Sequence, residues 1–205
     1  MTDLIAQYRV IHANSPGYGS SSSKRLPFIL PYVRATGARS IIDYGCGQSA
    51  LPDMLEAAAD CIVTRYDPAL SQYAQRPSGR FDLLVSIDVL EHIPEPDVGA
   101  TLADMASLAE RAIIIVDTKP AATFLPDGRN AHVTLRPAQW WAERLREAYP
   151  TVEPIAVRRR PASFRTWSMG LPRSLNIAAM TIGYRTRERM AKISSRVGLG
   201  SRRAT

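Results

Sequence analysis

A short apolar run at residues 40–49 leads directly into a glycine turn, with the sequence Ser-Ile-Ile-Asp-Tyr-Gly-Cys-Gly-Gln-Ser. About twenty residues further on, a second apolar run at 61–66 ends in Asp67. A turn of glycines lets the backbone approach a ligand closely, and an acid at the end of the next strand can hold ribose hydroxyls. Together these features predict a strand–turn–helix unit that binds a nucleoside-type cofactor.

The composition is that of a single folded domain. The chain has 205 residues, of which 45% are hydrophobic, so it can bury a full core. Its two cysteines, Cys46 and Cys61, lie close to the glycine turn, and neither a Cys-x-x-Cys motif nor a histidine-rich spacing occurs. We therefore predict neither a disulfide scaffold nor a metal site. No signal peptide is visible and the aliphatic runs are too short to span a bilayer, which favours a cytoplasmic protein.

Strand-like and helix-like segments alternate along most of the sequence. Helical spacing is expected at 2–12 and 24–35, on either side of a Ser/Gly-rich stretch at 14–23. From residue 40 onward, buried-strand runs alternate with helical segments: strands at 41–43, 61–66, 81–87 and 112–116, helices at 49–59, 96–109 and 137–149. The segments 152–157 and 163–169 are expected to close the sheet as an antiparallel pair.

This alternation predicts an α/β fold with a doubly wound, mostly parallel sheet. We divide the chain into an N-terminal helical cap or lid at 1–36, a central domain at 37–170 and a basic C-terminal extension at 171–205.

Three sequence blocks carry a family resemblance. They are Asp43-Tyr-Gly-Cys-Gly47, Asp67, and the run from Phe81 that continues through Asp88-Val-Leu-Glu-His92. In this order they resemble class I S-adenosylmethionine-dependent methyltransferases, and more narrowly the Leu-Glu-His subgroup that modifies small molecules, lipids, quinones and sugars. The resemblance covers about residues 8–145. It implies a Rossmann-like methyltransferase fold with S-adenosyl-L-methionine as cofactor.

The resemblance also implies a set of cofactor-binding residues. Gly45 and Gly47 would let the backbone pass close to the amino acid portion of the cofactor, and Asp43 would help to place its ammonium end. Asp67 would accept hydrogen bonds from both ribose hydroxyls, although Asp67-Pro68 also reads as an ordinary turn. Asp88 would lie beside the methyl group.

The sequence gives weaker signals for residues that would contact the methyl acceptor. His92 and His132 are the candidate catalytic residues, as acceptors of a proton from a hydroxyl, although His92 could equally shape the pocket and His132 cap a loop. Arg129 and Asn130 are candidate substrate ligands in the same polar loop. Tyr18 belongs to the Ser/Gly-rich stretch, which would act as a lid over the site or remain a surface loop.

One departure from the family pattern concerns the segment after Asp67. Only residues 68–80 separate it from the next strand, whereas relatives fit a helix and a third strand there. The sequence therefore predicts a trimmed third strand and leaves adenine recognition unassigned.

The positive charge is concentrated in the last quarter of the chain. Residues 1–157 carry 14 Lys/Arg and 18 Asp/Glu, whereas 158–205 carry 12 Lys/Arg and the single acid Glu188. Such a segment is typical of a solvated tail, and it also suits peripheral contact with a membrane or a partner protein. Few aromatic residues interleave the arginines, so nucleic-acid binding is disfavoured.

We therefore predict methyl transfer to a small-molecule, glycan or lipid acceptor, with oxygen as the expected methylated atom. The alternatives are a non-catalytic binding or scaffold protein that acts through its basic tail, and an RNA methyltransferase.

Overall fold

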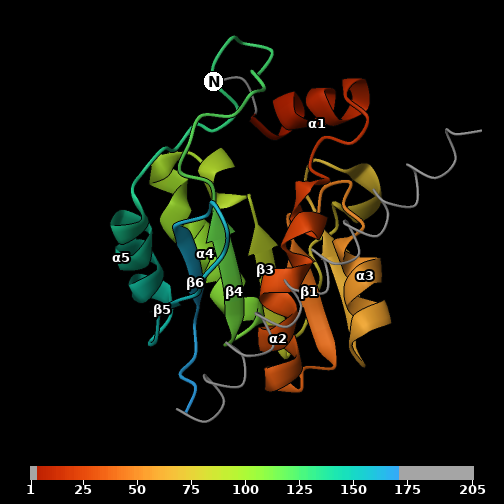
Figure 1. Ribbon diagram of the computed structural model, residues 1–205. Coiled ribbons are helices and arrows are strands. Elements are labelled where there is room, and N and C mark those ends of the chain that lie inside the picture. Colours follow the sequence, from red (N-terminus) through yellow and green to blue (C-terminus); the bar gives the residue numbers. More distant parts are fainter. Residues whose placement is uncertain (1–3, 171–205) are drawn as a thin grey trace, which may run out of the picture.

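The computed structural model describes residues 4–170, which form a central sheet covered by helices on both faces (Figure 1). The sheet has six strands in the order β2-β1-β3-β4-β6-β5. Their bounds are Ser40–Tyr44 for β1, Ile62–Tyr66 for β2, Leu83–Ile87 for β3, Ala112–Val116 for β4, Glu153–Pro154 for β5 and Ala162–Arg165 for β6. The first four strands are parallel, while β6 runs antiparallel to both β4 and β5. The predicted doubly wound α/β fold is confirmed.

The two faces of the sheet have separate apolar cores. On one face, α2 (Leu26–Thr36) and α3 (Leu51–Ala58) pack against side chains such as Ile41 and Val85. On the other face, α4 (Val98–Leu108) and α5 (Ala138–Ala148) pack against Ile42 and Ile114 (Figure 1). Every residue of β3 and β4 is buried. Continuous apolar runs form these strands because both of their faces are covered.

Helix α2 belongs to the layers of the central domain. It begins with Pro27 in its first turn and ends at Gly37, which has a φ of 65° in the left-handed region. Its residues Ile29 and Val33 are almost fully buried against the sheet. The predicted boundary at residue 37 therefore falls between a helix and the sheet that it covers, and the division into a cap and a central domain stays a prediction.

The trimmed edge of the sheet is present as predicted. Between β2 and β3 the chain forms one short 3₁₀ turn, η2 (Ser71–Tyr73), and no strand. Within residues 4–170, β2 is consequently an edge strand, and its first residue Ile62 is 75% exposed.

Helix α1 (Leu4–Asn14) lies across the carboxyl ends of the parallel strands, at the top of Figure 1. The Tyr8 hydroxyl donates to the Ala131 carbonyl at 2.6 Å, and the Gln7 amide donates to the Asp127 carboxylate at 2.8 Å. These contacts attach α1 to the long loop between β4 and α5. A cover is thus built over the strand ends from two distant parts of the chain.

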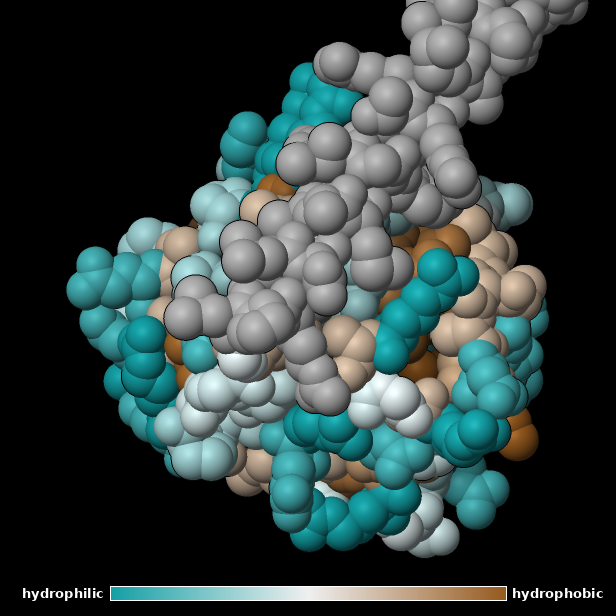
Figure 2. All heavy atoms as spheres, turned by 60° about the horizontal axis from the view of Figure 1, so that its bottom comes forward, coloured by the Kyte–Doolittle hydropathy of each residue, from teal (hydrophilic) through white to brown (hydrophobic). Residues whose placement is uncertain are grey.

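The opposite end of the molecule has a mixed surface. In Figure 2, hydrophilic side chains interleave with smaller apolar areas on the face that is brought forward. The residues that follow 170 carry the predicted basic extension and lie outside the described part of the chain. No helix within residues 4–170 combines the length and apolar character needed to cross a membrane.

The two-sided core makes a prediction about stability. Ile114 is fully buried in β4, so Ile114→Ala should lower the free energy of unfolding by about 2–5 kcal/mol through lost burial and a residual cavity. The matched control is Ile62→Ala on the edge strand, which should cost about 0.5 kcal/mol because that side chain is already exposed. Urea denaturation of the three proteins measures both effects, and equal losses would contradict the assigned core.

Candidate active site

A cavity of about 920 Å³ opens at the carboxyl ends of the parallel strands. The strand ends form its floor, and α1, residues 17–24 and part of the β4–α5 loop form its walls. Seven of the residues singled out in the sequence line it: Tyr18, Gly45, Gly47, Asp67, Asp88, His92 and His132. Three others, Asp43, Arg129 and Asn130, are not among the lining residues.

The glycine turn after β1 is packed against the chain itself. Gly45 and Gly47 have φ angles of 78° and 53°, which side-chain-bearing residues rarely adopt. A Cβ at Gly45 would collide with Val89, and one at Gly47 would lie 2.6 Å from the carbonyl oxygen of Gly19. Glycine is therefore required at both positions by the neighbouring protein atoms alone.

Asp67 joins the glycine turn to the end of β2. One carboxylate oxygen accepts the Gly47 N–H at 3.0 Å, and the other accepts the Ala69 N–H at 2.9 Å. The second bond is the turn contact that the Asp-Pro sequence suggested. Asp67 is buried yet lines the cavity. A carboxylate has about four lone-pair sites, so acceptor capacity remains for a ligand.

Asp43 lies inside the sheet, behind the turn. It is 1% exposed and aligns with Arg65 of β2, and its Oδ2 makes no hydrogen bond within the described residues. Burial raises the pKa of this carboxyl to about 7, although the charge of Arg65 opposes the shift. Asp43 can therefore carry a proton near neutral pH.

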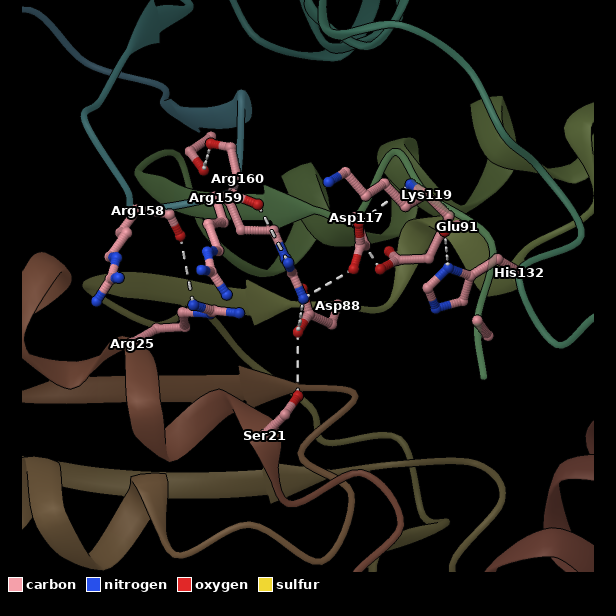
Figure 3. A network of polar contacts seen from close by, with 12 residues as sticks. Ser21, Arg25, Asp88, Glu91, Asp117, Lys119, His132, Arg158, Arg159 and Arg160 are labelled. Carbon is pink, nitrogen blue, oxygen red and sulfur yellow. Dashed lines mark hydrogen bonds and ion pairs between the residues drawn. The ribbon is translucent and has the colours of Figure 1, made fainter. Parts of the chain in front are cut away.

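Asp88 is held by an arginine that arrives from far along the chain (Figure 3). The Arg160 Nε donates to Asp88 Oδ1 at 2.8 Å and its Nη2 donates to Oδ2 at 3.1 Å. Ser21, from the segment after α1, also donates to Oδ2 at 3.1 Å. Asp88 has a φ of 57°, an uncommon conformation that the paired carboxylate helps to fix.

The same arginine also binds the end of β4. Arg160 Nη2 lies 2.8 Å from Asp117 Oδ2, and the Asp117 N–H donates to Glu91 Oε1 at 2.9 Å. Sequence reasoning missed Arg160, which it counted only as part of a basic run, and it missed Asp117 and Ser21. Asp117 did have a signal, because it follows a buried strand just as Asp67 and Asp88 do.

The two candidate catalytic histidines lie together. Their ring centroids are 4.8 Å apart in an edge-on arrangement. The Nδ1 of His92 lies 2.8 Å from the Ala131 carbonyl, and that of His132 lies 2.5 Å from the Lys119 carbonyl. A carbonyl only accepts, so each Nδ1 carries a hydrogen, and in the neutral ring the lone pair is then on Nε2. Burial lowers the pKa of His92 to about 4, which leaves it neutral at pH 7.

The segment after α1 closes over the glycine turn. The Gly17 N–H donates to Gln48 Oε1 at 3.2 Å, and Gln48 Nε2 donates to the His12 carbonyl at 3.0 Å. The Tyr18 hydroxyl is buried and has no hydrogen-bond partner within residues 4–170, and burial raises its pKa to about 12. The segment thus presents an unused polar group at the cavity.

Arg129 and Asn130 have structural contacts instead of a place at the cavity. Arg129 forms an ion pair with Asp127 at 2.7 Å and is 55% exposed. The Asn130 side chain accepts from the backbone N–H groups of Ala121 and His132 and donates to the Ala121 carbonyl. Loop contacts thus use both side chains, and their predicted contact with substrate stays a prediction.

Comparison with known proteins identifies the family. Residues 19–198 match a family model described as a methyltransferase domain. The chain belongs to this methyltransferase family. The match spans the glycine turn, the acids at the strand ends and both histidines. The prediction of a class I S-adenosylmethionine-dependent methyltransferase is confirmed, whereas the narrower Leu-Glu-His subgroup stays a prediction.

Solved structures support the same fold. The chain is similar to the 1,6-didemethyltoxoflavin-N1-methyltransferase of Burkholderia thailandensis, which was solved with 1,6-didemethyltoxoflavin and S-adenosylhomocysteine. The TM-score is 0.55 and the sequence identity is 16%, and the match covers 80% of this chain and 88% of that one. It is also similar to an O-methyltransferase family protein from Burkholderia thailandensis, with a TM-score of 0.51 and 15% identity over 80% of this chain and 64% of the other. No curated protein matches the chain in sequence.

The arginine network of this methyltransferase predicts an asymmetry between its ion pairs. Arg160→Ala leaves two mostly buried carboxylates without their cation, so it should lower the free energy of unfolding by about 3 kcal/mol. Arg129→Ala removes an exposed, solvent-screened pair and should lower stability much less. Urea denaturation distinguishes the two, and an Arg160 variant as stable as the Arg129 variant would contradict the role of the network.

The buried Asp43 predicts a pH dependence. Its pKa rises from 3.8 to about 7 on folding, so its contribution to stability is fully present below pH 4 and is lost as the pH rises through about 7. Asp43→Asn lacks this titration. The stability of the variant relative to the wild type should therefore increase as the pH is raised across that interval. Urea denaturation at several pH values measures the difference, and a difference that stays constant across this interval would contradict the raised pKa of Asp43.

Proposed function

We propose that this methyltransferase transfers a methyl group from S-adenosylmethionine to a hydroxyl oxygen of a small-molecule acceptor. The observation that carries the proposal is that one cavity is lined both by the glycine turn with Asp67 and by the two histidines, His92 and His132. We assign the part lined by the glycine turn and Asp67 to the cofactor, as the cofactor end, and the part lined by the histidines to the acceptor, as the acceptor end. Ligand cavities typically have volumes of about 300–1,000 Å³, so about 920 Å³ suits a nucleoside cofactor together with a small acceptor.

The cofactor end has the groups that such a ligand needs. Asp67 retains acceptor capacity for ribose hydroxyls after its two backbone bonds. The turn at Gly45 and Gly47 offers close backbone approach to the amino acid portion. Asp43 lies behind that turn, so it would act on the ammonium group indirectly, for example through a water molecule.

Asp88 takes a supporting role in this proposal. Both of its oxygens are bound by Arg160, and Ser21 binds one of them as well. Asp88 lines the cavity, but its main effect is to hold the end of β3 and the segment after α1 in fixed positions. Any contact of Asp88 with the cofactor would therefore involve a carboxylate whose charge is already neutralised by Arg160.

The chemistry requires alignment more than a strong catalyst. S-adenosylmethionine supplies an electrophilic methyl group on a positively charged sulfur. The chain has to bind the acceptor oxygen in line with that methyl and to remove the hydroxyl proton. The proposal gives proton removal to His132, whose ring lines the cavity, because the lowered pKa of His92 makes His92 a weak base at neutral pH. Tyr18 and α1 cover the cavity and exclude water.

The comparisons support a small acceptor. The similar toxoflavin methyltransferase was solved with its small-molecule substrate, and another similar structure belongs to the O-methyltransferases. Glycan and lipid intermediates remain within the same proposal where their reactive part fits the cavity. The preference for oxygen rests on the two Nε2 lone pairs at the acceptor end.

Calorimetric titration with S-adenosylhomocysteine tests the cofactor end. Wild-type protein should bind one equivalent. Asp67→Asn should weaken binding by about 10–100-fold, because a carboxylate that accepts several bonds becomes an amide with a single acceptor atom. Asp60→Asn, an exposed acid paired with Arg39, is the control and should bind like the wild type. Wild-type protein that does not bind would overturn the proposal.

The methylated atom needs its own measurement. Paired acceptors that differ only in a hydroxyl or an amine at one position are offered with S-adenosylmethionine, and mass spectrometry locates the methyl group. Methylation of the hydroxyl member is expected, and exclusive methylation of the amine would replace oxygen with nitrogen as the acceptor atom.

A further inference from the structure

Glu91, His92 and His132 form a cluster in which one potential ligand atom from each residue lies within 4.8 Å of those from the other two. The chain has only three histidines, and two of them are in this cluster. We propose that these three side chains bind a divalent transition-metal cation, with Zn²⁺ as the best match, at the acceptor end of the cavity. The proposal concerns metal binding and does not depend on the identity of the acceptor.

The histidines are already oriented as metal ligands. Each Nδ1–H donates to a backbone carbonyl, that of Ala131 for His92 and that of Lys119 for His132. In metal sites the histidine nitrogen that does not bind the metal usually makes such a bond, which fixes the tautomer and the ring orientation. The Nε2 lone pairs are consequently free for coordination. Both rings line the cavity, so a bound cation would be reachable from it.

Glu91 supplies the independent observation that points to a cation. It is 0% exposed, and while its Oε1 accepts the Asp117 N–H, its Oε2 has no hydrogen-bond partner within residues 4–170. A buried carboxylate oxygen without a partner is costly. The nearby cation Arg160 makes its ion pairs with Asp88 and Asp117 (Figure 3). A metal ion between Glu91 and the histidines would satisfy this oxygen.

The donor set indicates the class of metal. Two imidazole nitrogens and one carboxylate oxygen occur in catalytic zinc sites that leave a coordination position open, and they also suit other transition metals. Mg²⁺ and Ca²⁺ prefer sites made of oxygen alone. Ligand distances of about 2.0–2.2 Å require the three atoms to be roughly 3–4 Å apart, so coordination needs only a small contraction from the observed cluster.

A bound cation would change how the acceptor loses its proton. With the His132 Nε2 coordinated, that nitrogen is not available as a base. An acceptor hydroxyl at the open position would instead have its own pKa lowered by the positive charge, and its proton would pass to solvent. The two roles of His132 exclude each other in any one complex.

The test is a Zn²⁺ titration of the full chain after treatment with a chelator, with neither cofactor nor acceptor present. Competition with a chromophoric chelator gives stoichiometry and affinity. One Zn²⁺ per chain is expected, and Glu91→Gln and His132→Ala should each weaken binding by about 10–100-fold. Mg²⁺ at equal concentration should not displace the zinc.

His12→Ala is the matched control, because His12 is the third histidine and lies outside the cluster. It should bind Zn²⁺ like the wild type. Circular dichroism checks that each variant is folded, and His132→Ala carries the test if the buried Glu91→Gln does not fold. Wild-type protein that fails to bind Zn²⁺, or an equal loss of affinity in His12→Ala, would overturn the proposal.

Discussion

The contact of Arg160 with Asp88 and Asp117 holds together the strand ends at the floor of the cavity. Its guanidinium joins the ends of β3 and β4 to the turn between β5 and β6. Asp88 in turn accepts a hydrogen bond from Ser21, in the segment after α1. Two carboxylates at adjacent strand ends would repel each other without a cation between them. A planar group with several donors suits this geometry, because it can bind both acids at once, which a lysine cannot do in the same way. The floor of the cavity and one edge of its cover thus depend on one side chain.

Much of the fold follows from the order of apolar runs. The strands at β3 and β4 are unbroken apolar segments because both of their faces are covered, and this pattern is visible in the sequence. The trimmed edge was equally visible, since too few residues separate Asp67 from β3 to form a helix and a strand. The division between a cap at 1–36 and the central domain stays a prediction, but the packing of α2 could not be read from sequence position. Sequence position suggested a unit before the sheet, whereas the apolar side chains of α2 fill the same core as α3.

The site was predictable only where the chemistry is local in sequence. Gly45, Gly47 and Asp67 stand at turns that periodicity can locate, and all three line the cavity. Arg160 could not be found in this way, because its partner Asp88 is 72 residues away. Arg129 and Asn130 were expected at the substrate because they are polar residues in a suitable loop, and the sequence did not indicate the contacts within the loop that use their side chains. The grouping of Glu91 and His92 with His132 was hidden for the same reason as Arg160, because a loop brings them together.

The contacts of the Asp88 carboxylate can form only late in the synthesis of the chain. Two side chains donate hydrogen bonds to this carboxylate: Ser21, near the start of the described chain, and Arg160, near its end. During synthesis the four parallel strands leave the ribosome before Arg160 does, so β3 and β4 must first exist with two adjacent acids and no cation between them. The ion pairs at these strand ends are therefore completed after the four parallel strands, and a chain that stops short of the β5–β6 turn would lack the cation that joins the two acids.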